Sequence, residues 1–227
     1  MKHLASAFLV IALLPILVMV AGGGHDTPRA LAAGAPRDAG SVEVRALIML
    51  TRFYGGNTNL IRDAMEFYGW NFTYTGLDSV VENCFYGEPK AVDVLIGDIT
   101  DLSGYDVLAI MPGNSGAPGG SHGQLLASPE AVSLVSQAAQ EGLLVMAFCG
   151  GVRVLAAADV INGIHVTGKA AYLQEYLDAG AIWAGEPSPP IRDGNILTSV
   201  RNQLHSTRVI EISRTAVDSL RAARAAK

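Results

Sequence analysis

One cysteine at the end of an apolar run is the residue best placed for nucleophilic chemistry. The run Val145 to Phe148 leads into Cys149, and Gly150 and Gly151 follow before an apolar helical pattern begins. A strand that turns sharply into a helix strains the backbone at the bend and needs small residues after it. Amides at the start of the helix favour a thiolate and can bind an oxyanion. The pattern therefore predicts a nucleophile elbow, with a buried structural cysteine as the alternative.

Alternating strand and helix patterns surround this elbow. Strands are expected at Val42 to Leu50, Trp70 to Thr75, Val92 to Ile96, Tyr105 to Met111, Leu143 to Phe148 and Ile164 to Thr167. The segment Ile191 to Ser199 is typical of a hairpin with an Asp-Gly turn, or of a turn that leads into a strand. Helices are expected at 59–68, 129–141, 169–178, after the elbow, and from Leu204 or Ser206, fraying at 221–227. Such alternation predicts an α/β doubly wound, mostly parallel sheet. Ligands of such sheets bind beyond the carboxyl ends of the strands, so Gly113-Asn114 and Cys149-Gly150 should share one crevice.

Polar and aromatic residues near that crevice are further candidates. His122 lies in a Gly-rich loop, 113–123, that should hang over the crevice, and a solvated loop histidine is the alternative. Tyr54 follows the first strand and could line the pocket. His165 is expected to be a buried or edge histidine, and His205 to belong to the cap region of the last helix. No His or Cys pair has ligand spacing, so neither a metal nor a cofactor is predicted.

The composition and the N-terminus limit the kinds of partner. The chain has 227 residues and a formal net charge of -5, without the basic patch that nucleic-acid binding needs. Lys2 and His3 precede an uncharged apolar run, Leu4 to Ala21, typical of a signal peptide or membrane anchor. We therefore expect a leader at 1–21, a flexible tether at 22–41 and an extracytoplasmic domain at 42–227. In an exported protein Cys84 and Cys149 could form a disulfide, and the sequence leaves this open.

Four segments together resemble the ThiJ/PfpI family of the class I glutamine amidotransferase-like superfamily. They are the strand 105–113, the elbow 145–155, the step 178–181 and the segment 193–198, and the likeness extends from Val44 to about Leu220. The resemblance implies a flavodoxin-like three-layer sandwich, a homo-oligomer such as a dimer, and a reactive elbow cysteine. Activities in the family include peptidase or amidase action, glyoxalase or deglycase chemistry, and chaperone-like roles.

Carried over residue by residue, the resemblance makes Cys149 the nucleophile. It makes the Gly150 amide one oxyanion donor and the Asn114 amide, after Gly113, the other. Asn57 stands where many members have a glutamate. Peptidase-like members have a histidine at the position of Gly150, and deglycase-like members have one near Lys169.

Two functions are consistent with this pattern. The first is a cysteine-dependent hydrolase or glyoxalase/deglycase acting on a small carbonyl or amide substrate, with a small molecule or peptide as ligand. The alternative is a non-enzymatic binding, sensor or chaperone-like domain that has kept the fold and lost the acid/base partners of the cysteine.

Overall fold

The computed structural model describes the globular part of the chain. It covers residues 43–55, 57–83, 88–186, 188–200 and 203–226. The expected leader and tether, 1–21 and 22–41, lie outside these residues, and so does Cys84.

Strands and short helices alternate along most of the described chain. The strands are β1 (Arg45–Met49), β2 (Asn71–Gly76), β3 (Val80–Val81), β4 (Lys90–Ala91), β5 (Val94–Leu95), β6 (Val107–Ile110), β7 (Leu144–Phe148), β8 (His165–Val166), β9 (Ile182–Trp183), β10 (Ile191–Asp193) and β11 (Ile196–Ser199). The α-helices are α1 (Asn57–Phe67), α2 (Gly123–Leu126), α3 (Pro129–Gln140), α4 (Val152–Ala157), α5 (Leu173–Asp178) and α6 (Gln203–Ala225). The 3-10 helices are η2 (Ile96–Asp98), η3 (Cys149–Gly151) and η4 (Ala170–Tyr172).

Seven strands form one central sheet in the order β10-β11-β7-β6-β1-β2-β5. Neighbouring strands are parallel, except that β10 and β11 form an antiparallel hairpin. The chain leaves β1 for β2 on one side and later returns to β6 on the other, so the strand order reverses at β1 and β6. Ligand sites of open α/β sheets lie at such a reversal, beyond the carboxyl ends of the strands. The predicted doubly wound sheet is confirmed.

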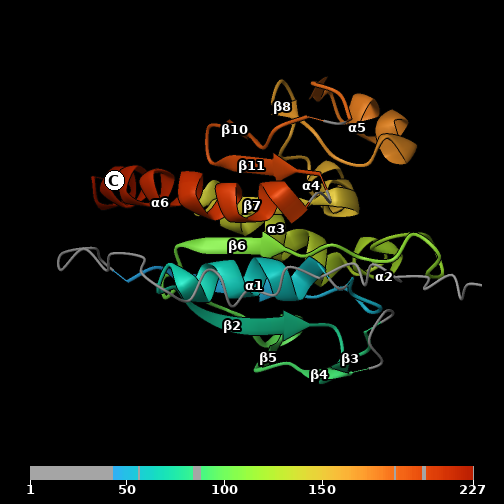
Figure 1. The fold of residues 1–227 in the computed structure, drawn as a ribbon, viewed down its shortest axis with the longest axis horizontal. Coiled ribbons are helices and arrows are strands. Elements are labelled where there is room, and N and C mark those ends of the chain that lie inside the picture. The colour runs from blue at the N-terminus through green and yellow to red at the C-terminus, as the bar shows by residue number, and fades with distance from the viewer. Residues whose placement is uncertain (1–42, 56, 84–87, 187, 201–202, 227) are drawn as a thin grey trace, which may run out of the picture.

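Helices cover both faces of the sheet and complete three layers (Figure 1). On one face α1 and α6 bury Ile61 and Ile210 against a cluster that includes Ile48. On the other face α3 and α4 pack on a second cluster, in which Val135 and Leu47 lie. Neighbouring residues of β1 enter different clusters because successive side chains of a strand point to opposite faces. The sheet is therefore buried on both sides, which explains why the sequences of its central strands β1, β6 and β7 are mostly apolar.

Local sequence signals were accurate where a cap or turn residue specifies the backbone. Ser128 caps α3 by accepting a hydrogen bond from the Ala131 amide, and Pro129 opens the helix as predicted. The Asp-Gly turn of the hairpin is also confirmed, with Gly194 in the left-handed region at φ +59°.

Other elements differ from the prediction. The expected helix 169–178 is divided into η4 and α5, and the strand expected at 92–96 is only two residues long. The β3–β4 hairpin and α2 were not predicted.

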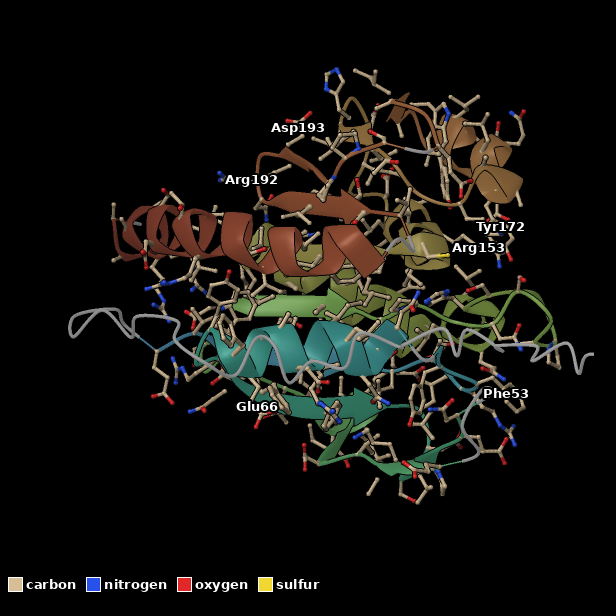
Figure 2. The ribbon with its side chains drawn as sticks, in the orientation of Figure 1. Phe53, Glu66, Arg153, Tyr172, Arg192 and Asp193 are labelled. Carbon is tan, nitrogen blue, oxygen red and sulfur yellow. The ribbon has the colours of Figure 1, made fainter. Side chains whose placement is uncertain are left out.

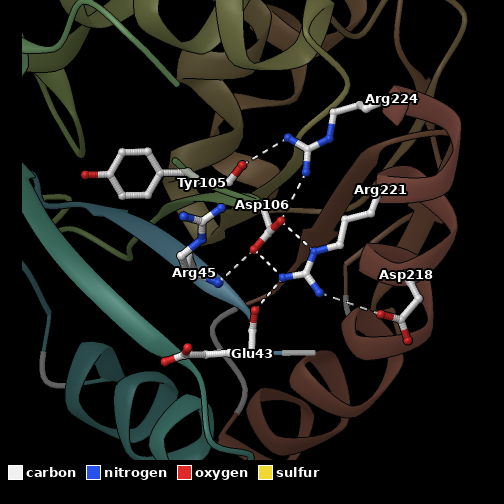
Figure 3. Close-up of polar contacts among 7 residues, drawn as sticks. All are labelled: Glu43, Arg45, Tyr105, Asp106, Asp218, Arg221 and Arg224. Atoms are coloured by element: carbon white, nitrogen blue, oxygen red, sulfur yellow. Dashed lines mark hydrogen bonds and ion pairs between the residues drawn. The ribbon is translucent and has the colours of Figure 1, made fainter. Parts of the chain in front are cut away.

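The carboxyl end of α6 is fixed to the start of β6 by an ionic cluster (Figure 3). Asp106 is 4% exposed and accepts hydrogen bonds from Arg221 Nε at 2.7 Å and from Arg224 Nη2 at 3.1 Å. The Arg45 amide donates to the same carboxylate at 2.9 Å. The predicted fraying of this segment is wrong, because α6 continues to Ala225 and its arginines bind a buried carboxylate.

Candidate functional site

Cys149 stands at a strained bend between β7 and the helix that follows. Phe148 has extended backbone at φ -114° and ψ 132°, and Cys149 has a φ of +57°. Left-handed backbone is uncommon in residues other than glycine and is often found at functional sites. The cysteine is 6% exposed and is in no disulfide with another described residue. This backbone geometry is that of the predicted elbow.

Neighbouring chain segments leave little room for side chains at the two positions after the cysteine. A Cβ on Gly150 would lie 2.5 Å from Ser121 Oγ, and a Cβ on Gly151 would lie 3.1 Å from Ile110 Cγ2. The first distance is far inside van der Waals contact, so any side chain at position 150 would displace Ser121. The glycine at position 150 is therefore explained by packing against the loop 113–123.

Ser121 and His122 form a buried hydrogen-bonded pair beside the elbow. Each is 1% exposed. His122 Nε2 is 2.7 Å from the Met111 carbonyl oxygen, and its Nδ1 is 2.6 Å from Ser121 Oγ. A carbonyl only accepts, so Nε2 carries the proton and Ser121 donates its hydroxyl to Nδ1. The alternative of a solvated loop histidine is wrong, because the loop folds back and buries this side chain.

The buried imidazole of His122 is neutral near pH 7. Burial is the largest influence and lowers its pKa from 6.5 to about 4, against the opposing effect of the hydrogen bond to Met111. The positive charge of Arg153 also lowers the pKa. With its Nε2 proton held on a carbonyl, His122 is unsuited to take up a proton from Cys149.

Arg153 and Tyr172 hold the loop onto the elbow helix. Arg153 Nη1 donates to the Ser121 carbonyl at 2.6 Å, and its Nε donates to Glu175 at 2.7 Å. The Arg153 guanidinium also stacks 4.2 Å from the Tyr172 ring, whose hydroxyl accepts from the Ser121 amide at 3.1 Å. Figure 2 shows Arg153 and Tyr172 together at the end of the molecule toward which the strand arrows point.

The sequence interpretation missed these two residues. Arg153 lies four residues after Cys149, and Tyr172 lies in the segment after β8. The sequence did carry one signal for Arg153: residues four apart on a helix lie on the same face, so Arg153 could have been expected near Cys149.

The structure changes the expected set of oxyanion donors. The Asn114 amide donates to the Phe53 carbonyl at 3.1 Å, and its side-chain Oδ1 accepts from the Gly116 amide at 2.9 Å. The predicted role of the Asn114 amide is therefore not supported in this conformation, because a loop-to-loop bond already uses its proton. The amides of Gly113 and Gly150 have no such bond to another element among the described residues. They are the better pair of candidate donors.

Comparison with known proteins identifies the family. The model of the DJ-1/PfpI family matches residues 48–210, well over half of the chain. The chain belongs to this family. Protein DJ-1 homolog D of Arabidopsis thaliana is 35% identical over 112 residues, which are 48% of this chain and only 27% of that relative. The resemblance predicted from the motifs is confirmed.

Solved structures of the DJ-1/PfpI fold agree with the architecture. DJ-1beta of Drosophila melanogaster has a TM-score of 0.64 and 17% identity, and the match covers 79% of this chain and 96% of that one. A ThiJ/PfpI domain protein of Brachyspira murdochii has a TM-score of 0.64 and 15% identity over 79% and 99% of the two chains. A two-domain protein of Anabaena variabilis with a ferritin-like second domain matches at a TM-score of 0.64 and 20% identity over 75% of this chain and 48% of its own. These likenesses establish the fold.

Three further residues of this DJ-1/PfpI chain were predicted to line the pocket, and they differ in burial: Tyr54, Asn57 and Lys169. Tyr54 is 2% exposed, packs in the core beside α1 and donates its hydroxyl to the Glu88 carbonyl at 3.0 Å, so its polar end has a structural role. Asn57 is the first residue of α1, and Lys169 directly precedes η4, each of them partly buried.

Of the other histidines, the structure describes the side chain of His165, whose hydrogen bonds go to Asp193. His165 is an exposed edge residue whose Nδ1 lies 2.9 Å from Asp193 Oδ2, so the buried alternative is wrong. The side chain of His205 lies outside the described part of the chain. Within that part, no group of three or more His, Cys, Asp or Glu could hold a metal ion, and no helix is long and apolar enough to cross a bilayer.

Tyr176 brings an unsatisfied hydroxyl close to the elbow. It is fully buried, and its hydroxyl has no hydrogen-bond partner among the described residues. The hydroxyl lies 3.4 Å from the place of a Cβ on Gly168, and that Cβ would lie 3.1 Å from the Cys149 carbonyl oxygen. Burial strongly raises the pKa of Tyr176, and the nearby Cys149 raises it further. This hydroxyl therefore stays protonated, and it can both donate and accept a hydrogen bond.

Proposed function

We propose that this protein uses Cys149 as a nucleophile on a small carbonyl substrate, as a cysteine-dependent enzyme of glyoxalase, deglycase or hydrolase type. The observation that carries the proposal is the strained elbow, with Cys149 at φ +57° where the central strands end. In the reaction the sulfur attacks the carbonyl carbon and forms a C–S bond. The electron pair of the C=O bond moves onto oxygen, where the Gly150 and Gly113 amides are the candidate donors.

The surroundings of the elbow favour an aldehyde or ketone over an amide. Adding a thiolate to a carbonyl needs a site for the oxyanion, whereas cleaving an amide also needs an acid to protonate the departing amine. His122 cannot supply that acid near pH 7, because it is neutral and both ring nitrogens are already hydrogen-bonded. The substrate class proposed here is therefore a small reactive carbonyl compound.

Turnover of three substrate types tests the proposal. Methylglyoxal, glutamine and a short peptide are incubated with the wild type, Cys149→Ala and the control Cys84→Ser. We expect consumption of methylglyoxal by the wild type and by Cys84→Ser, none by Cys149→Ala, and no action on glutamine or peptide. Equal consumption by the wild type and Cys149→Ala would refute the proposal.

The alternative function, a non-enzymatic binding or sensor domain, is supported by one specific observation. Three candidate side chains do not exchange a proton near pH 7: His122 is neutral, Ser121 donates its hydroxyl to it, and Asn57 carries an amide where many family members have a glutamate. A carbonyl compound would then bind to the cysteine without being converted. A reversible mass increase on Cys149 in the absence of product would favour this function over catalysis.

A further inference from the structure

Ser121 and His122 fill the space that a side chain at position 150 would take. A Cβ on Gly150 would lie 2.5 Å from Ser121 Oγ and 3.2 Å from His122 Nδ1. The chain thus places a loop serine and an imidazole beside the residue that follows the nucleophile.

The same two side chains also touch the neighbouring strand end. A Cβ on Gly113 would lie 3.0 Å from Ser121 Oγ and 3.2 Å from His122 Cε1. Gly113 follows β6 and Gly150 follows β7, and these two strands are parallel neighbours. The pair therefore lies between the two glycines whose amides are the candidate oxyanion donors.

Several hydrogen bonds hold the pair in place. The Ser121 amide, carbonyl and hydroxyl are each hydrogen-bonded, to Tyr172, Arg153 and His122 respectively. His122 has left-handed backbone at φ +69° and is tied to the Met111 carbonyl. Strained backbone of this kind persists only where its surroundings determine it strongly.

We propose that Ser121 and His122 are positioning residues that set the separation of the Gly113 and Gly150 amides. The inference rests on the proposed function of Cys149 and adds to it the component that shapes the oxyanion site. Ser121 donates a hydrogen bond to His122, and His122 donates one to the Met111 carbonyl. The series ends at this carbonyl oxygen, which neither takes up nor releases a proton. The pair acts by fixing geometry and takes no part in proton transfer.

Carbonyl addition in positioning variants tests this role without requiring turnover. Methylglyoxal bound to Cys149 protects the thiol from iodoacetamide, so the protecting concentration measures how well the adduct is held. His122→Asn retains a residue that tolerates left-handed backbone, and Ser121→Ala removes only the hydroxyl. We expect each to need about 10-fold more methylglyoxal, since small displacements at a reacting centre have effects of this order or larger. Unchanged protection in both variants would overturn the proposal.

The tautomer of His122 gives a spectroscopic readout that a general packing role would not move. Nitrogen-15 NMR of the wild type should show a neutral imidazole protonated at Nε2, and Ser121→Ala should shift its Nδ1 signal. A wild-type imidazole protonated at Nδ1 would contradict the assigned hydrogen bonds and the proposal with them.

A compensating pair of substitutions tests the packing independently of the chemistry. Gly150→Ala should lower the melting temperature because its Cβ overlaps Ser121, and Gly150→Ala/Ser121→Gly should recover part of the loss. Gly97→Ala is the matched control, because a Cβ on Gly97 has nothing within 4 Å. If the wild type shows no protection by methylglyoxal, the proposed function fails. If the double variant is no more stable than Gly150→Ala, the positioning role fails by itself.

Discussion

Cys149 and His122 both have left-handed backbone and both adjoin Gly150. Cys149 directly precedes this glycine in the chain, and the side chain of His122 packs against it. Their φ values are +57° and +69°. Each such residue costs on the order of 1 to 3 kcal/mol, so the surrounding hydrogen bonds and packing must offset this energy. At the residue scale the site thus contains two backbone conformations that lower stability, and the proposed function explains them by its need for a thiol and two amides in fixed positions.

Burial of His122 predicts a loss of stability in mild acid. Between its folded pKa of about 4 and its ordinary value of 6.5, the unfolded chain binds a proton that the folded chain does not. Stability therefore falls as the pH falls through this window, by about 2 kcal/mol between pH 7 and pH 5. His122→Asn should lower this pH dependence by that amount in urea unfolding. An identical dependence in the two proteins would show that His122 is not buried in the neutral form.

The unpaired hydroxyl of Tyr176 predicts a stabilising substitution. A buried hydroxyl without a partner costs free energy, so Tyr176→Phe should raise the free energy of unfolding by about 1 kcal/mol. Tyr54→Phe is the contrasting control, because its hydroxyl donates to Glu88, and it should lose a similar amount. Destabilisation by Tyr176→Phe would mean that the hydroxyl is bonded in solution.

At the element scale, the local signals of the sequence were sufficient for the elbow, the capped start of α3 and the β10–β11 hairpin. Each depends on residues within a few positions of one another, such as Ser128 and Pro129. The burial of His122 and the bond from Asn114 to Phe53 could not be predicted, because they join segments far apart in the chain. The strands β3, β4 and β9 were not predicted and β8 was predicted too long, because a strand of two residues carries no usable periodicity.

The cluster around Asp106 predicts how α6 is held to the sheet. Burial alone would raise the pKa of Asp106, but hydrogen bonds from Arg221 and the Arg45 amide lower it below its ordinary 3.8. Asp106→Asn should cost about 3 kcal/mol near neutral pH, because it leaves two arginines without their carboxylate. Asp218→Asn is the control, since that carboxylate is 72% exposed and lies 3.9 Å from Arg221.

The pH dependence of this cluster has a defined sign. A carboxyl with a lowered folded pKa stabilises the protein above its unfolded value of 3.8 and loses that contribution as the pH falls toward the folded value. The difference between wild type and Asp106→Asn should therefore shrink below about pH 4 in urea unfolding. A difference that is constant down to pH 2 would exclude the ionic contribution.

At the scale of the whole molecule, the two ends of the sheet have separate tasks. The Asp106 cluster ties α6 to the amino ends of β1 and β6, whereas the elbow and its loop lie at the carboxyl ends. A substitution in the Asp106 cluster should leave the reactivity of Cys149 unchanged. Its effect on the free energy of unfolding should add to that of a substitution at the elbow, because distant sites without shared partners contribute additively. The fold thus places the strained elbow at the carboxyl ends of the strands and the Asp106 cluster at their amino ends.

Export of the domain is a proposal supported by the composition of residues 1–41. The uncharged run 4–21 and the Gly, Ala and Pro-rich segment after it have the character of a leader and a tether. Expression of the full chain, followed by cell fractionation and N-terminal sequencing, should recover the domain outside the cytoplasm. Recovery of an intact, cytoplasmic chain would contradict export.

The reactivity of Cys149 as a function of pH tests the central claim most directly. Burial disfavours a thiolate, whereas the elbow amides favour it, and the rate of labelling by iodoacetamide sums both influences. In a Cys84→Ser background, we predict that Cys149 at pH 6.5 is labelled at least about 10-fold faster than an ordinary thiol, which is almost wholly protonated there. Labelling no faster than that of the ordinary thiol at any pH would show that the elbow holds an inert cysteine.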